Sequence, residues 1–221
     1  MKPIVYLHGF GSGPQSTKAR FFHEQFAERG VGIEIPQLDE GNFERLTITG
    51  QLRVIDRAVK GAPAILMGSS LGGYLAALYA ASHPNVERLV LMAPAFQFPR
   101  RWRQRFAGQE LEHWKANGSL PFYHYSFKAE RPLGYQFVED SAQYDDEPDF
   151  SQPALVLHGI DDSVVPADVS RQFAERHPNV TFRLLKSGHE LTDVLDQLWM
   201  ETAKFLGFQN TYPSTDRAST M

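Results

Sequence analysis

Residues 64–82 read AILMGSSLGGYLAALYAAS, and within them a G-x-S-x-G motif is centred on Ser70. The motif joins a short apolar run, residues 64–67, to an apolar helix-like segment, residues 71–82. A tight reversal from strand to helix leaves no room for side chains beside the serine, which accounts for the glycines two positions before and after it. The sequence therefore predicts that this turn presents the Ser70 hydroxyl as a nucleophile. The alternative is an ordinary glycine-rich turn.

Short apolar runs alternate with longer helix-like segments along the whole chain. Apolar runs without polar alternation are typical of strands that are buried on both faces of a parallel sheet. We expect six strands, at residues 4–7, 31–35, 64–67, 88–92, 154–157 and 181–185, and helices at about 17–29, 43–59, 71–82, 166–176 and 191–206. This order predicts a three-layer α/β fold with a mainly parallel sheet.

Two segments break this alternation. Residues 95–150 separate two strands by more than a usual crossover, and they hold 13 of the 27 aromatic residues. This insertion is either a core-filling extension or a cap that lines a pocket. The polar stretch 207–221 is expected to be a frayed tail. We therefore expect a single domain over residues 1–206, with the insertion as a cap.

Composition excludes several classes of protein. The 221 residues carry a formal charge of −4, which gives no general attraction to nucleic acid. The chain has no cysteine, so disulfides and thiolate metal sites are excluded. The first apolar run is too short for a secretory signal, and no stretch reaches the roughly 20 apolar residues of a membrane span. We expect a cytoplasmic protein without stable membrane association; the oligomeric state is left open.

A serine nucleophile needs a base, and His189 has the best context of the eight histidines. It follows Ser187-Gly188 at the carboxyl end of the last predicted strand, where ligands bind in open α/β sheets. The alternative is an exposed loop histidine. By contrast, His83 and His177 each precede a proline, and we expect both to end helices at the opposite edge of the sheet.

A carboxylate is needed to hold the base, and an acidic pair follows the strand at residues 154–157. Asp161 and Asp162 lie at the same predicted sheet edge as Ser70 and His189. The order Ser, Asp, His along the chain is that of α/β-hydrolases. Only one of the two adjacent carboxylates can face the histidine, and the other is expected to turn the chain.

Backbone donors for an oxyanion are expected at two places. Leu71, directly after the serine, offers one N–H, and Phe10 in the glycine-rich loop after the first strand offers the second, with Gly11 as the alternative. That loop has Pro14 where a dinucleotide site needs glycine, and the chain has neither a G-K-[ST] nor an H-E-x-x-H motif. We therefore expect neither a cofactor nor a metal.

These residues together resemble the α/β-hydrolase superfamily. More closely, residues 4–10, 14–19 and 133–140 resemble the small bacterial esterases of the YqiA/YcfP type, over a match that extends to about Leu206. The resemblance implies a sheet without the superfamily's first antiparallel pair, and hydrolysis of a small-molecule carboxylic ester, with a thioester as the alternative. It also implies Ser70 as nucleophile, Asp162 as acid, His189 as base, and an oxyanion hole made by Phe10 and Leu71.

The acid loop supports Asp162 over Asp161, since its G-x-x-D-x-V-V-P spacing resembles that of many α/β-hydrolases. We expect Val164 and Val165 to anchor this loop in the core, and Asp161 to face solvent.

Short- to medium-chain esters are the expected substrates, because a 56-residue cap encloses a small volume. One alternative is an acyl-CoA thioesterase, in which the arginines of the insertion meet the phosphates, although such a run is more often a solvated helix face. These arginines are Arg100, Arg101, Arg103 and Arg105. The other alternative is a non-catalytic ligand-binding module of the same fold.

Overall fold

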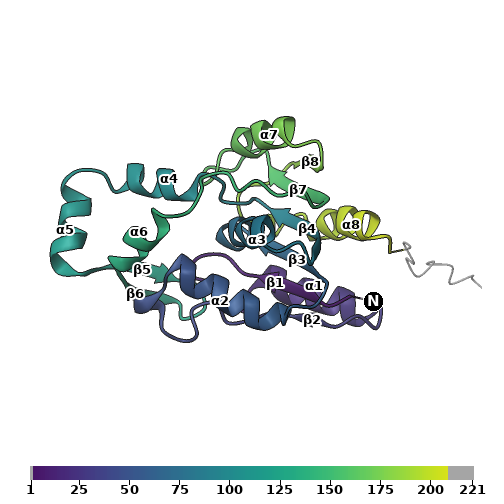
Figure 1. Cartoon of the computed structure of the whole chain (residues 1–221), viewed down its shortest axis with the longest axis horizontal. Coiled ribbons are helices and arrows are strands. Elements are labelled where there is room, and N and C mark those ends of the chain that lie inside the picture. Colours follow the sequence, from purple (N-terminus) through teal and green to yellow (C-terminus); the bar gives the residue numbers. More distant parts are fainter. Residues whose placement is uncertain (1, 209–221) are drawn as a thin grey trace, which may run out of the picture.

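The computed structural model describes residues 2–208 (Figure 1). Six strands form one sheet in the order β2-β1-β3-β4-β7-β8, and each of its pairings is parallel. The strands are β1 (Ile4–Leu7), β2 (Ile33–Glu34), β3 (Ala64–Ser69), β4 (Val86–Met92), β7 (Ala154–Gly159) and β8 (Val180–Leu185). The predicted six-stranded sheet is confirmed. The stretch 207–221, predicted to be a frayed tail, lies outside the described residues from position 209 onward.

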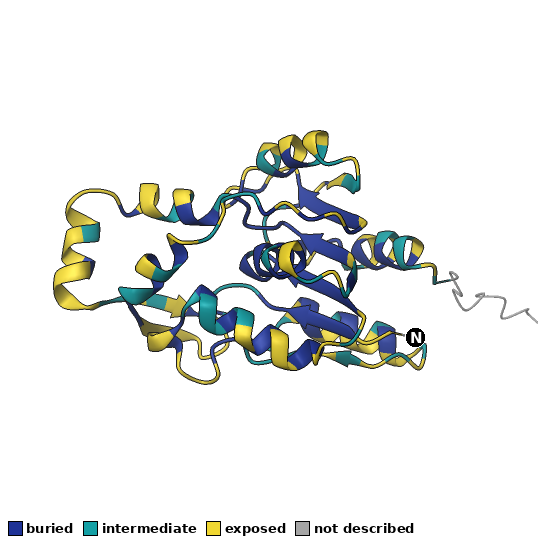
Figure 2. Ribbon diagram, in the orientation of Figure 1, coloured by how far each residue is buried: buried dark blue, intermediate teal, exposed yellow. Residues whose placement is uncertain are grey.

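Helices cover both faces of this sheet. Side chains of β1 alternate between two apolar clusters, with Ile4 and Tyr6 in one and Val5 and Leu7 in the other. The first cluster contains side chains of α1 (Thr17–Ala27) and α8 (Leu195–Leu206). The second contains side chains of α2 (Ile48–Val59), α3 (Leu71–Ser82) and α7 (Ala167–Arg176). Burial on both faces explains why β1 and β3 are almost wholly apolar, whereas the edge strands β2 and β8 are partly exposed and carry Glu34 and Arg183 (Figure 2).

Two helices begin later than the sequence predicts, each for a local reason. The predicted helix at 43–59 is a 3₁₀ turn, η1 (Phe43–Arg45), followed by α2, because Thr47 caps α2 by accepting a hydrogen bond from the Gly50 N–H at 2.9 Å. The last helix begins at Leu195 and not at residue 191, since Leu191 has a positive φ of 54° that no helix accommodates.

The insertion at residues 95–150 has its own secondary structure, which the sequence pattern did not predict. It contains α4 (Phe98–Arg105), α5 (Gln109–Asn117), an antiparallel pair of β5 (Ser119–His124) and β6 (Ala129–Gly134), and α6 (Gln136–Ser141). Trp114 is fully buried, and its indole N–H donates to the Leu133 carbonyl at 2.9 Å. The outer side of α5 is exposed (Figure 2).

Hydrogen bonds join the insertion to the rest of the protein. The Thr49 N–H and hydroxyl, at the start of α2, both donate to the Asp140 carboxylate, at 2.9 and 2.5 Å. The Tyr125 N–H donates to the Gly11 carbonyl at 2.6 Å. The insertion is therefore fixed to the loop after β1 as well as to α2.

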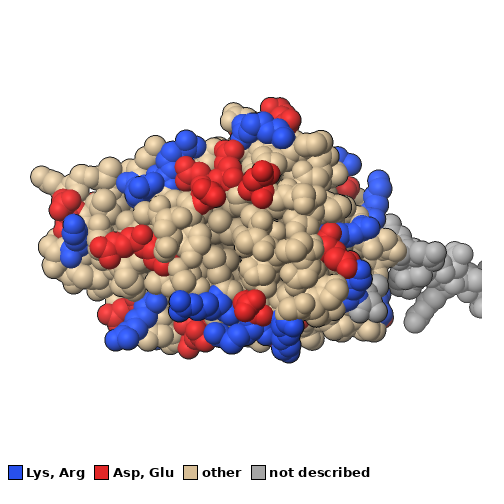
Figure 3. All heavy atoms as spheres, viewed as in Figure 1, with Lys and Arg blue, Asp and Glu red and all other residues tan. Residues whose placement is uncertain are grey.

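The exterior carries both signs of charge. On the face shown in Figure 3, Lys and Arg side chains lie among Asp and Glu. Some of the surface charges form ion pairs, such as Arg57 with Glu40 at 2.5 Å. Within residues 2–208, no helix has the length and apolar character needed to cross a bilayer.

Helix α3 packs tightly against the end of β1 at Gly72. A Cβ atom at this position would lie 2.1 Å from the Leu7 carbonyl oxygen and 2.6 Å from that of His8. We expect Gly72→Ala to lower the free energy of unfolding by about 1–3 kcal/mol or more, because backbone atoms cannot yield to the added methyl group. Gly32→Ala is the control, since nothing lies within 4 Å of its Cβ position. Urea unfolding of both variants tests this, and equal losses of stability would contradict it.

Candidate active site

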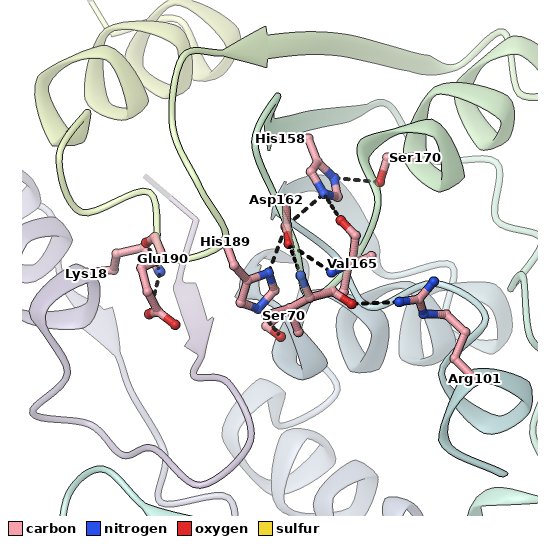
Figure 4. A network of polar contacts seen from close by, with 10 residues as sticks. Lys18, Ser70, Arg101, His158, Asp162, Val165, Ser170, His189 and Glu190 are labelled. Carbon is pink, nitrogen blue, oxygen red and sulfur yellow. Dashed lines mark hydrogen bonds and ion pairs between the residues drawn. The ribbon is translucent and has the colours of Figure 1, made fainter. Parts of the chain in front are cut away.

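Ser70 occupies the turn between β3 and α3 in a strained conformation. Its φ and ψ are 54° and −118°, a region that non-glycine residues rarely adopt. Its N–H donates to the Met92 carbonyl at 2.9 Å, and its carbonyl accepts from the Ala95 N–H at 3.0 Å. A Cβ on Gly68 would lie 2.3 Å from the Gly72 oxygen, so this tight turn requires both glycines. The turn holds the Ser70 side chain at the carboxyl end of β3 (Figure 4).

His189 connects this serine to a carboxylate. It lies in the loop between β8 and α8, with its Nε2 2.9 Å from Ser70 Oγ and its Nδ1 2.7 Å from Asp162 Oδ2 (Figure 4). The nitrogen that faces a carboxylate must carry the proton, so Nδ1 donates to Asp162. Nε2 is then unprotonated and accepts a hydrogen bond from the Ser70 hydroxyl. These contacts fit the roles of nucleophile, base and orienting acid that the sequence analysis assigns to Ser70, His189 and Asp162, and the roles themselves stay predictions.

Asp162 is buried and accepts four hydrogen bonds. Its Oδ1 accepts from the N–H groups of Val164 and Val165, both at 2.8 Å. Its Oδ2 accepts from His189 and from His158 Nε2, the latter at 3.0 Å. Burial by itself raises the pKa of Asp162, but the bonds from His158, His189 and the Val165 N–H outweigh it and hold that pKa well below its usual range. The carboxylate is therefore ionised and fixed in place.

The structure separates the two acidic residues as the sequence analysis expects. Asp161 is exposed, whereas Asp162 is 7% exposed and contacts His189. The expectation that both valines anchor the loop is wrong for Val164, which is 51% exposed, while Val165 is buried. What holds the carboxylate is the pair of backbone N–H groups, which the turn directs at Oδ1 whatever the side chains are.

The two expected oxyanion donors lie beside the serine. Leu71 is the first residue of α3, so its N–H has no acceptor within the helix. The Phe10 N–H donates no hydrogen bond to any residue in the described chain. The neighbouring Gly9 is close to Ser70, since a Cβ built on it would lie 3.5 Å from Ser70 Cβ. Both N–H groups are thus free to bind a ligand oxygen, and their role as oxyanion hole remains a prediction.

A cavity of about 1030 Å³ opens above Ser70 and His189. One wall is aromatic and comes from the loop after β1 and from the insertion: Phe10, Phe98, Trp102, Phe122, Tyr123, Tyr125 and Phe127. The other wall is polar and comes from the segment before and within α1, including Ser12, Gln15, Ser16, Thr17 and Lys18. The aromatic residues of the insertion therefore do both things that the sequence left open, since Phe106 and Trp114 fill a core while others line the cavity.

The charged residues around this cavity are mainly cations. Lys18, Arg101, Arg105 and Lys128 line it, against the single carboxylate of Glu190. Of the other two arginines considered above, Arg100 lies 3.5 Å from Asp146 and Arg103 donates to the Pro99 carbonyl at 3.3 Å. Arg101 also donates to the Val164 carbonyl at 2.6 Å, which joins α4 to the acid loop (Figure 4).

Sequence reasoning missed two side chains that support this site. His158, at the end of β7, contacts Asp162, and its spacing of four residues from that carboxylate was the available signal. Lys18 is buried in α1, and its Nζ donates to the Glu190 carbonyl next to His189 (Figure 4). Burial lowers the pKa of Lys18, and the charges of Glu190 and Asp162 oppose that effect.

The remaining histidines play no part in this cluster. His83 and His177 cap the carboxyl ends of α3 and α7, as expected, and each has a ring nitrogen close to a carbonyl of its own helix. Within residues 2–208, no three His, Asp or Glu side chains are grouped so as to hold a metal ion.

The geometry makes a prediction about the two adjacent carboxylates. We expect Asp162→Asn to slow the labelling of Ser70 by a fluorophosphonate probe roughly 10²–10⁴-fold, because an amide N–H would face the donors His158 and His189 and the base would lose its orientation. Asp161→Asn should change the rate less than about tenfold, since that side chain is exposed. Circular dichroism confirms that both variants are folded. A severe loss in Asp161→Asn alone would reverse the assignment.

Comparison with protein families finds one whose model covers nearly the whole chain. The model of "Uncharacterised protein family (UPF0227)" matches residues 3–206. Among curated proteins, "Palmitoyl-protein thioesterase ABHD10, mitochondrial" of Pongo abelii is 28% identical over 193 residues, which are 78% of this chain and 61% of that protein. "Proline iminopeptidase" of Xylella fastidiosa is 28% identical over 116 residues, 49% of this chain and 37% of that protein. The chain therefore spans less than two thirds of the length of these relatives.

Solved structures share this fold over nearly the full described length. Alpha/beta hydrolase domain-containing protein 10 from mouse superposes with a TM-score of 0.78 at 21% identity, covering 93% of this chain and 89% of that one. Est1E from Butyrivibrio proteoclasticus, bound to ferulic acid, has a TM-score of 0.78 at 19% identity and covers 94% and 90%. At such identities the likeness establishes the fold, which is that of the α/β-hydrolases.

Proposed function

The chain belongs to the UPF0227 family and has the α/β-hydrolase fold, and from its site we propose that it is a serine hydrolase that cleaves carboxylic esters of short to medium acyl length. The observation that carries this proposal is the position of His189, within hydrogen-bond distance of both Ser70 Oγ and Asp162 Oδ2. The strained turn at Ser70 and the two free N–H groups beside it supply the other parts that acyl transfer needs.

In the proposed acylation, Ser70 Oγ attacks the carbonyl carbon of the ester while His189 Nε2 takes its proton. The carbonyl oxygen becomes an oxyanion and is stabilised by the N–H groups of Phe10 and Leu71, at the positive end of the α3 dipole. Asp162 stabilises the imidazolium that forms. Return of the proton from His189 to the departing alcohol leaves an acyl group on Ser70.

Deacylation repeats these steps with water. His189 removes a proton from a water molecule, whose oxygen attacks the acyl carbon of the ester on Ser70. The second oxyanion occupies the same site as the first. When it collapses, the bond to Ser70 breaks, His189 returns the proton to Oγ, and a carboxylic acid is released. The net reaction consumes one water and leaves the protein unchanged.

The relatives support hydrolysis of acyl compounds without naming a substrate for this chain. One curated relative is named a thioesterase and another a peptidase, and the solved structure of Est1E contains ferulic acid. These printed activities differ in the bond that is cleaved. The aromatic lining of the cavity suits the acyl group of any of these substrates, and its volume leaves room for the leaving group beside it.

A second candidate is hydrolysis of acyl-CoA thioesters on the same triad. The cations at the cavity favour it, because Arg101, Arg105 and Lys128 are placed where phosphates of a bulky leaving group could bind. The two candidates are separated by comparing butyryl-CoA with a butyryl aryl ester. A higher kcat/KM for butyryl-CoA, reduced by Arg105→Gln, would favour the thioester.

The nucleophile is tested by two neighbouring serines. We expect Ser70→Ala to lower the kcat for p-nitrophenyl butyrate by several orders of magnitude, because only the oxyanion and binding contributions remain. Ser69→Ala is the matched control and should have a mild effect. If Ser70→Ala retains turnover or labelling by a fluorophosphonate, another residue is the nucleophile. If the wild type shows neither, the chain is a non-catalytic binding module.

The acyl pocket is tested by two tryptophans of the insertion. Trp102 lines the cavity, whereas Trp114 is fully buried in the insertion and does not line the cavity. We expect Trp102→Phe to change the dependence of kcat/KM on acyl length, with about 0.8 kcal/mol, or roughly fourfold, for each methylene that the wider pocket newly buries. Trp114→Phe should lower the thermal midpoint and leave that dependence unaltered. A panel of aryl esters from acetyl to decanoyl measures both, and an identical profile in wild type and Trp102→Phe would contradict the assignment.

A further inference from the structure

An unbroken line of polar contacts extends behind the triad into the core. Ser170 Oγ lies 2.9 Å from His158 Nδ1, and His158 Nε2 lies 3.0 Å from Asp162 Oδ2. The same oxygen, Oδ2, receives His189, which contacts Ser70 (Figure 4). Ser170 and His158 take no part in the reaction proposed above, although they end on the carboxylate that orients its base.

The contacts of His158 fix which of its nitrogens carries a proton. Nε2 lies 2.9 Å from the Val165 carbonyl oxygen as well as 3.0 Å from Asp162 Oδ2, and both of these atoms can only accept. Nε2 must therefore be the donor. In the neutral ring Nδ1 is then an acceptor, and the Ser170 hydroxyl is the donor that satisfies it. The Ser170 hydroxyl thus stabilises the tautomer that donates to Asp162.

The His158 N–H lies in the buried interior, where solvent water does not reach to take its place as a donor to Asp162. His158 and Ser170 are both fully buried, His158 on β7 and Ser170 on α7, and Asp162 is 7% exposed. In such surroundings a hydrogen bond to a charged group is stronger than in water, and a lost donor leaves its acceptor unpaired.

We propose that His158, held in one tautomer by Ser170, is a positioning residue that limits the basicity of Asp162 and thereby sets the pH range over which His189 acts as a base. The inference rests on the proposed function, since it concerns the same triad. Two donors, His158 and His189, share Oδ2. The hydrogen bond from His158 lowers the basicity of that oxygen, so Asp162 stabilises the protonated form of His189 less strongly.

The other charged groups around His189 do not donate a hydrogen bond to Asp162. Asp162 faces it from the loop after β7, and Ser70 faces it from the turn before α3. From α1, Lys18 is paired with Glu190 at 3.9 Å, so its positive charge has a carboxylate beside it. His158 is the side chain besides His189 that donates directly to Asp162; the other two donors are backbone groups bound to Oδ1.

The direction of the effect follows from these contacts. Without the His158 donor, the Asp162 carboxylate becomes more basic and stabilises the protonated form of His189 more strongly. His189 then keeps its proton to higher pH, where it cannot accept one from Ser70. The acid limb of the pH profile must move to higher pH, and the carboxylate, held by one donor fewer, orients His189 less well.

Four variants test the proposal with p-nitrophenyl butyrate between pH 5 and 9. His158→Met removes the donor with little change in volume, and His158→Gln keeps an N–H near the position of Nε2. Ser170→Ala removes the hydrogen-bond partner of His158 Nδ1 and so weakens the preference for this tautomer. His177→Met is the control, a histidine at the end of the same helix α7 as Ser170. We expect the acid limb of kcat/KM to move up by about half to one pH unit in His158→Met, with kcat about tenfold lower and KM nearly unchanged. Ser170→Ala should give a smaller shift in the same direction, His158→Gln should restore most of both losses, and His177→Met should shift nothing.

The outcomes distinguish this inference from the proposed function. A wild-type protein without ester turnover would overturn the proposed function itself. An active wild type with an unshifted acid limb in a folded His158→Met variant, or an equal shift in His158→Met and His158→Gln, would overturn only the role of His158. If His158→Met fails to fold, Ser170→Ala and His158→Gln decide, because an unshifted Ser170→Ala profile contradicts the tautomer argument.

Discussion

The site depends on how closely one helix can approach one strand. At Gly72 the first turn of α3 lies against the carbonyl oxygens of Leu7 and His8, at a distance that any side chain would increase. This contact places the turn that carries Ser70 beside the loop that follows β1. Ser70 and Phe10 then line the same cavity. If the two backbones were further apart, a nucleophile and a pair of donors would both exist, but they could not act on one carbonyl group.

Much of this arrangement could be predicted from sequence because its causes are local. The strands follow from apolar runs, and Ser70, Asp162 and His189 each follow a strand that ends at the same sheet edge. Their catalytic roles remain predictions, although the structure brings the three side chains together. His158 had only its four-residue spacing from Asp162 as a signal, and Ser170 had none, since a contact between a strand and the next helix leaves no periodic pattern. The secondary structure of the insertion could not be predicted either. Its aromatic residues contribute both to a core and to the lining of the cavity, so they follow no single period.

The aromatic insertion and the predicted oxyanion loop form one packed unit. The Phe10 ring contacts Trp102 and Phe122 of the insertion, with centroids 5.2 and 5.7 Å apart, and the Gly11 carbonyl accepts a hydrogen bond from Tyr125. The residue whose N–H is free beside Ser70 is thus anchored by its side chain in the segment that walls the cavity. If Phe10 is the oxyanion donor that we propose, contacts of a substrate with the aromatic lining and the position of that donor are coupled through a single phenylalanine.

That coupling has a consequence for how the protein loses activity on heating. Segments of a protein open locally with free energies far below that of global unfolding, and the insertion has an outer helix, α5, that is largely exposed. Opening of the insertion would withdraw the Phe10 ring and displace its N–H from Ser70 while the parallel sheet stayed intact. Heat inactivation would then precede the loss of secondary structure. A protein with an unchanged far-ultraviolet circular dichroism spectrum would already have lost its activity.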